Sequence, residues 1–131
     1  MSWLFFKLAF IVNFHNIQRT MMTSHIIRAR YNNSAFKGII ESPSDRGQAA
    51  KAMFKTMGIK TNEILYSVSA GELVALVDGT AEQIAAMNMI VMSSGGFSQI
   101  MVEEVISTKA MANVMKNSAA KAAKYRAPNK K

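Results

Sequence analysis

The sequence contains no cysteine and only two histidines, His15 and His25. The chain therefore cannot form disulfides, and it cannot use a cysteine nucleophile, a zinc finger or thiolate ligands for an iron–sulfur cluster. A histidine-rich metal site is excluded too, although a carboxylate site is not. The missing cysteine fits a reducing compartment. We expect a cytoplasmic protein, with no metal site and no cofactor.

Nucleotide-binding and hydrolase motifs are also missing. The one pair of adjacent glycines, Gly95 and Gly96, precedes an expected strand instead of opening a helix, which excludes a P-loop and a dinucleotide fingerprint. Neither G-x-S-x-G nor H-E-x-x-H occurs. These absences leave the reaction, if the protein catalyses one, undefined.

Two stretches of the chain each carry charges of only one sign. Residues 61–108 contain six acids and no base, whereas residues 107–131 contain seven bases and no acid. The formal net charge of +8 therefore belongs to the tail. Because basic clusters attract polyanions, we expect nonspecific contacts with an acidic partner, nucleic acid or membrane through Lys116, Lys121, Lys124 and Arg126.

The chain has 131 residues, of which half are hydrophobic, so it fits one domain with a real core. We place that domain at residues 23–108, between a hydrophobic N-terminal extension at 1–22 and a basic helical tail at 109–131. The apolar run in the extension is shorter than the roughly 20 residues that span a bilayer. Three interpretations stay open: a dispensable extension, a membrane-interface anchor of residues 1–20, and a cleaved signal.

Local patterns predict the first half of the domain. Period-two alternation of apolar residues predicts a strand from Thr23 to Tyr31, which residues 32–34 end as a turn. In residues 42–45, Ser-Pro-Ser-Asp predicts a helix start with Ser42 as the cap. The helix is expected to stop at Gly58.

The second half begins with two predicted strands, at residues 64–68 and 73–77, joined by a turn. The second of these is apolar on both faces and is therefore expected to be central. A capping box of Thr80 and Gln83 predicts a helix that runs to about Met92. A fourth strand at residues 99–106 and a further helix from residue 108 complete the order.

The order β-α-β-β-α-β predicts an α+β, ferredoxin-like fold with a four-stranded antiparallel sheet and both helices on one face, followed by a C-terminal helix. On the other face, Ile26, Met101 and Val105 would form an exposed apolar patch. Packing two such sheets together about a two-fold axis removes that exposure. We therefore expect a homodimer or larger homo-oligomer that forms a dimeric α/β barrel.

Several motifs occur together within about residues 23–106: Tyr31, Ser42-Pro43 followed by Arg46, Met57-Gly58, Tyr66 and Gly95-Gly96. In these the chain resembles the GYD-domain family of the dimeric α/β-barrel superfamily. The family's Gly-x-Tyr-Asp turn is replaced by Ser69-Ala70-Gly71-Glu72, and the acid- and proline-rich opening of its second helix by residues 78–82. The resemblance implies the barrel fold but no particular reaction, because the superfamily includes monooxygenases, decarboxylases, isomerases and plain binding modules.

Two groups of residues are candidate sites. His25 is expected beside Val77 and Asp78, since the first and third strands are neighbours in this fold. A His25–Asp78 pair would form an oriented general base. The alternative is a histidine that makes an ordinary hydrogen bond near a strand end.

The second group is Glu72 with Arg28, Arg30 and Tyr31, which could bind a polar or anionic ligand between two sheets. The alternative is a cross-strand ion pair of small net value. Tyr66 is either a core aromatic or a pocket wall.

Three functional interpretations follow. The preferred one is an uncharacterised homo-oligomeric α/β-barrel module. The others are an enzyme that acts on a small, anionic organic substrate in the barrel cleft, and an interaction protein that docks through its basic tail.

Overall fold

The computed structural model describes residues 3–4, 7 and 22–129, so most of the predicted N-terminal extension lies outside the described residues. From residue 23 the elements are β1 (Thr23–Tyr31), α2 (Asn33–Glu41), α3 (Arg46–Thr56), β2 (Lys60–Ser67), β3 (Glu72–Gly79), α4 (Ala81–Ser93), β4 (Phe97–Val105) and α5 (Thr108–Ala122). Among the described residues, no helix is both long enough and apolar enough to cross a membrane.

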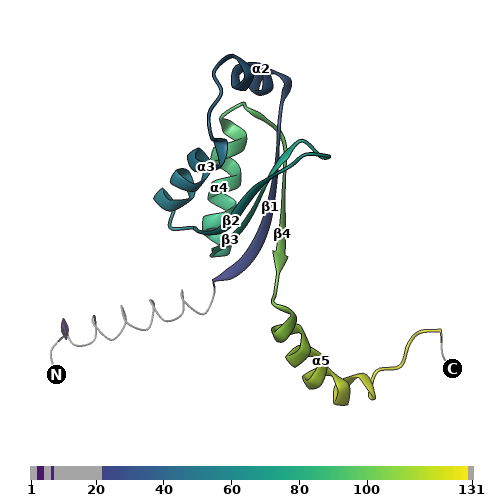
Figure 1. The fold of residues 1–131 in the computed structure, drawn as a ribbon. Coiled ribbons are helices and arrows are strands. Elements are labelled where there is room, and N and C mark those ends of the chain that lie inside the picture. Colours follow the sequence, from purple (N-terminus) through teal and green to yellow (C-terminus); the bar gives the residue numbers. More distant parts are fainter. Residues whose placement is uncertain (1–2, 5–6, 8–21, 130–131) are drawn as a thin grey trace.

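The four strands form one antiparallel sheet in the order β2-β3-β1-β4. Helices α3 and α4 lie on the same side of this sheet, and α5 extends away from it (Figure 1). The predicted ferredoxin-like α+β fold and its C-terminal helix are therefore confirmed. The apolar strand β3 lies at the centre beside β1, as its sequence predicted.

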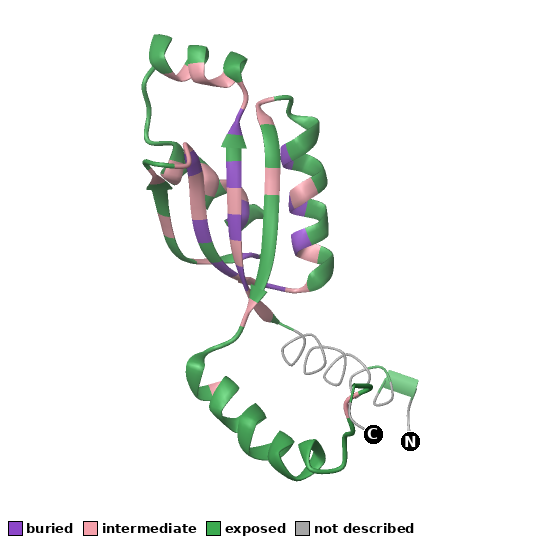
Figure 2. Cartoon of the chain, turned by 90° about the vertical axis from the view of Figure 1, so that its right-hand side faces the viewer, coloured by how far each residue is buried: buried purple, intermediate pink, exposed green. Residues whose placement is uncertain are grey.

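The core lies between the sheet and helices α3 and α4. Alternate residues of β1 are buried, as the bands along that strand show in Figure 2. The side chains that fill this layer come from both helices and the two central strands, with Ile59 before β2: Ile27, Phe54, Ile59, Ala75, Val77, Ile84, Met87 and Val91. Among residues 22–129, no helix packs on the opposite face of the sheet.

Helix α2 was not predicted. Residues 32–34 were expected to form a turn, but Asn32 instead caps this helix and its side chain accepts a hydrogen bond from the Ala35 amide at 2.9 Å. Asparagine favours helix caps as well as turns, because one side-chain oxygen can satisfy a free backbone amide in either setting. The helix is held to the rest of the domain by Phe36, whose ring meets Tyr31 edge-on.

The cap of α3 also differs from the prediction. Asp45, not Ser42, is the N-cap residue, and its carboxylate accepts a hydrogen bond from the Gln48 amide at 3.2 Å. Ser42 instead ends α2, where its amide donates to the Gly38 carbonyl. Pro43 therefore separates two helices, because proline disfavours helical backbone in the residue before it.

The capping box of α4 is confirmed. The Gln83 amide donates to Thr80 Oγ1 at 3.2 Å, and the Thr80 amide donates to Gln83 Oε1 at 2.9 Å. Gly58, after α3, has a φ of 75°, which a residue with a Cβ rarely adopts. A Cβ there would also lie 2.8 Å from the Gln83 side-chain nitrogen. A larger residue at position 58 would therefore have to displace the Gln83 side chain that completes the capping box of α4.

Candidate functional site

Three adjoining cavities, of about 370, 400 and 260 Å³, are all lined by Tyr31 and Arg46. They lie on the helix-bearing side of the sheet, where β1 ends and α3 begins. The 370 Å³ cavity is lined on its other sides mainly by apolar residues from three elements, which are Phe36 and Ile39 of α2, Ile64 of β2 and Leu73 of β3. We call this 370 Å³ space the Tyr31–Arg46 cavity.

Tyr31 is the last residue of β1 and is only 6% exposed. Its ring stacks on Phe97 with centroids 4.9 Å apart and meets Phe36 edge-on at 5.7 Å. Burial raises the pKa of the Tyr31 phenol, and the neighbouring Arg46 side chain partly offsets that rise. The phenol is therefore protonated at neutral pH, in a fixed position at the cavity wall.

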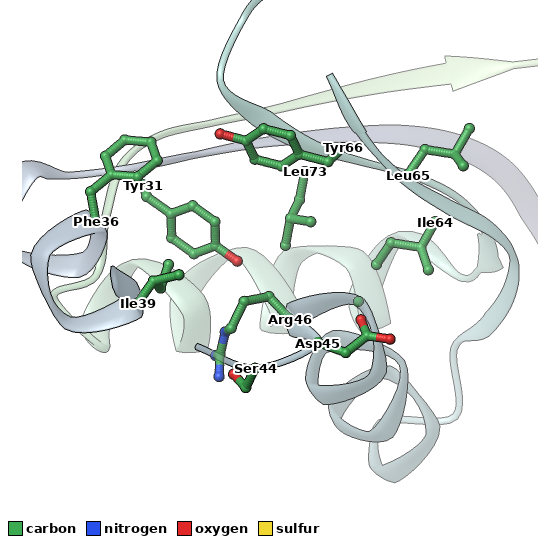
Figure 3. Close-up of a pocket in the computed structure, with 11 residues that line it drawn as sticks. Tyr31, Phe36, Ile39, Ser44, Asp45, Arg46, Ile64, Leu65, Tyr66 and Leu73 are labelled. Atoms are coloured by element: carbon green, nitrogen blue, oxygen red, sulfur yellow. The ribbon is translucent and has the colours of Figure 1, made fainter. Parts of the chain in front are cut away.

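Arg46 is the first residue of α3, directly after the Asp45 cap, and it is exposed. The ion pair of Arg30 with Glu72 is the only one among residues 22–129, so Arg46 forms none with a carboxylate in that part of the chain. Its charge also lies at the positive end of a helix dipole, which favours a nearby anion. Figure 3 shows the Tyr31 hydroxyl directed towards the Arg46 side chain.

Tyr66 is half exposed and lines the same cavity from β2, opposite Leu73 of β3. Of its two predicted roles, the structure places it as a pocket wall. Its hydroxyl lies near Gly71 and Phe36, since a Cβ at Gly71 would be 3.8 Å from that oxygen. Two phenols and one guanidinium therefore face a mainly apolar space.

The predicted neighbours of His25 are only partly correct. His25 is buried and lies opposite Val77, as expected. Its Nε2 lies 3.3 Å from Thr23 Oγ1, whereas Asp78 accepts a hydrogen bond from Ser24 Oγ at 2.6 Å. Ser24 and His25 are adjacent on a strand, so they point to opposite faces. In the part of the chain described, the predicted His25–Asp78 base is therefore not assembled.

The pKa of Asp78 is lowered, first by the hydrogen bond from Ser24 and then by one from Asn62. A lowered pKa keeps the carboxylate ionised at neutral pH and is explained by these local donors. His25 Nδ1 is buried without a partner among the described residues. It faces the core at the opposite end of β1 from Tyr31.

The predicted cluster around Glu72 is divided by the sheet. Arg30 Nε lies 3.8 Å from Glu72 Oε2, with the Arg30 side chain 48% exposed and that of Glu72 8% exposed. Arg28 shares their face, opposite Val74 of β3 and Met101 of β4. Tyr31 points to the other face, so these arginines and Tyr31 do not form one site. Arg28 borders a separate cavity of about 310 Å³ on the helix-free side.

Within residues 22–129, no three histidine or acidic side chains are close enough to hold a metal ion. Comparisons with protein-family models, curated proteins and solved structures found no match for this chain. The resemblance to the GYD-domain family therefore remains a prediction.

Sequence patterns missed the role of Arg46 and the α2 residues that close the cavity. Arg46 was noted only as part of a motif behind Ser42-Pro43. A usable signal was the spacing of Phe36, Ile39 and Ile40 after Asn32, which is typical of one apolar helix face.

Proposed function

We propose that this protein is a self-associating α/β module in which the sheets of two copies pack face to face. The observation that supports it is the composition of the helix-free face. Across the sheet, Leu65, Val74, Arg28 and Met101 form one row, one residue from each strand. The residues at the two ends of this row are exposed, Leu65 by 62% and Met101 by 53%.

The neighbouring row extends the same apolar surface. Leu76 and Ile26 lie at its centre, between Glu63 on β2 and Glu103 on β4. Burying such a surface stabilises a protein by roughly 25 cal/mol per Å² of apolar area removed from water. A second copy of the chain would cover this surface with an equal and matching apolar area.

The charges on this face also suit a two-fold arrangement. Arg28 and Arg30 lie on the central strand β1, and Glu63 and Glu103 lie on the two edge strands. A two-fold rotation can bring the basic centre of one sheet over the acidic edges of another. Like charges then stay apart, as an isologous interface requires.

Replacing Met101 with lysine is expected to convert the oligomer towards monomer. The new charge would have to be buried without a partner between two sheets, which costs several kcal/mol. Light scattering over a range of protein concentrations measures the mass. Met89→Lys is the matched control, because Met89 is exposed on α4 on the other side of the sheet. A wild-type protein that is monomeric, or a Met101→Lys variant of unchanged mass, contradicts this function.

A second candidate function is attachment of α5 to an anionic lipid surface. This helix buries none of its residues. Met111, Val114 and Met115 are exposed on one side of it at helical spacing, and residues 107–131 carry bases but no acid. A basic helix with an exposed apolar stripe is typical of helices that lie in a membrane interface.

Replacing Val114 with aspartate is expected to weaken binding to vesicles of equal parts phosphatidylserine and phosphatidylcholine by about tenfold or more. Asn113→Asp adds the same charge on the opposite side of α5, and we expect a loss of less than about threefold. Vesicle sedimentation measures both. An equal loss in the two variants, together with equal binding to duplex DNA, would show contact through charge alone and reject a lipid-specific role.

A further inference from the structure

The Tyr31–Arg46 cavity has the size of a small-molecule site. Its volume of about 370 Å³ is within the range of about 300 to 1,000 Å³ that is usual for ligand pockets. That space equals about a dozen water molecules at about 30 Å³ each. A compound with one aromatic ring and one or two substituents fits that volume.

The polar groups at the cavity favour an anion over other ligands. Arg46 is the one cationic side chain in the lining, and no carboxylate among residues 22–129 is paired with it. The Asp45 carboxylate is engaged by the Gln48 amide as the helix cap. A single guanidinium matches a single carboxylate, since its planar pair of donors fits the two oxygens. A polyphosphate would need more cationic partners than this lining offers.

Tyr31 supplies a second donor. The Tyr31 hydroxyl is directed towards the Arg46 side chain and is protonated at neutral pH, so its proton can be donated to an anion bound there. The stacking on Phe97 and the edge contact with Phe36 hold that proton in place. The remaining wall, from Ile39, Ile64 and Leu73, is apolar and suits a ring or a short alkyl group.

We propose that the Tyr31–Arg46 cavity binds a small aromatic monocarboxylate, with its carboxylate on Arg46 and the Tyr31 hydroxyl and its ring among the apolar side chains. This site lies on the opposite side of the sheet from the face assigned to self-association. The two proposals are therefore independent, and an oligomer mass that contradicts one leaves the other standing.

The test is titration of the full-length chain with benzoate, followed by amide NMR shifts and calorimetry. We expect saturable binding that shifts the amides around Tyr31, Arg46 and Tyr66. Benzamide, which has the same shape without the charge, is expected to bind at least about tenfold more weakly, because a charged hydrogen bond is the stronger one. Absence of saturable benzoate binding at millimolar concentration, or equal binding of benzamide, overturns the proposal.

The matched variants are Arg46→Met and Lys51→Met, which each remove one positive charge from α3; Lys51 is exposed and does not line the cavity. Arg46→Met is expected to weaken benzoate binding at least about tenfold, and Lys51→Met by less than about twofold. Tyr31→Phe is expected to weaken it about threefold or more through the lost donor while the aromatic stacking is kept. Amide spectra establish that each variant is folded. Equal benzoate affinity in folded wild-type and Arg46→Met proteins would reject the assigned carboxylate position.

Discussion

Replacing Met87 with alanine is expected to lower the free energy of unfolding by about 2 to 5 kcal/mol. Met87 lies on α4 and is 1% exposed, in contact with the sheet, so its loss removes apolar burial and leaves a cavity. Urea denaturation followed by circular dichroism measures the change.

Met89→Ala is the matched control, since Met89 lies on the same helix and is 75% exposed. Its replacement changes helix propensity in the same way but should alter stability by less than about 0.5 kcal/mol. Similar losses in the two variants would show that α4 does not present Met87 to the core.

Replacing Tyr31 with alanine is expected to cost about 3 to 5 kcal/mol of stability, the usual range for a buried aromatic residue. Tyr31 joins three elements, because its ring contacts Phe36 of α2 and Phe97 of β4 from the end of β1. Near-ultraviolet circular dichroism together with thermal unfolding reports the loss. A cost below about 1 kcal/mol would mean that the aromatic contacts do not support α2.

Tyr31→Phe separates the hydroxyl from the ring and should cost about 0.5 to 1.5 kcal/mol at neutral pH. Since the folded-state pKa of Tyr31 is raised, its contribution is present below the unfolded value near pH 10 and is lost as pH rises through the folded value. Wild-type stability should therefore fall more steeply above pH 10 than that of Tyr31→Phe. Parallel alkaline profiles would contradict the burial of the phenol.

The parts of the fold that could be predicted are those that rest on short-range patterns. Period-two alternation placed β1 at Thr23–Tyr31, and the capping box placed the start of α4. Because β1 was expected beside β3, His25 could be placed opposite Val77, where the structure has it. Such features depend on backbone periodicity and on hydrogen bonds between neighbours along the chain.

The parts that could not be predicted depend on contacts between distant residues. Asn32 is compatible with both a turn and a cap, and packing of Phe36 on Tyr31 decides in favour of a helix. The cavity requires Arg46 of α3 to reach Tyr31 of β1, and no spacing in the sequence shows that meeting. Tyr66 lies on the edge strand β2, which leaves it half exposed where a central strand would bury it.

The strand order has a consequence for how the chain folds during synthesis. The first strand made, β1, has both its partners later in the chain, with Thr23 opposite Gly79 and Ser24 opposite Val105. Both edges of β1 therefore stay unpaired until residues 32–79, more than half of the domain, have been made. Sheets closed by such non-local pairs fold slowly, and unpaired strands invite aggregation. A nascent chain that ends before β4 would keep β1 as an open edge, which is the species that a chaperone should recognise.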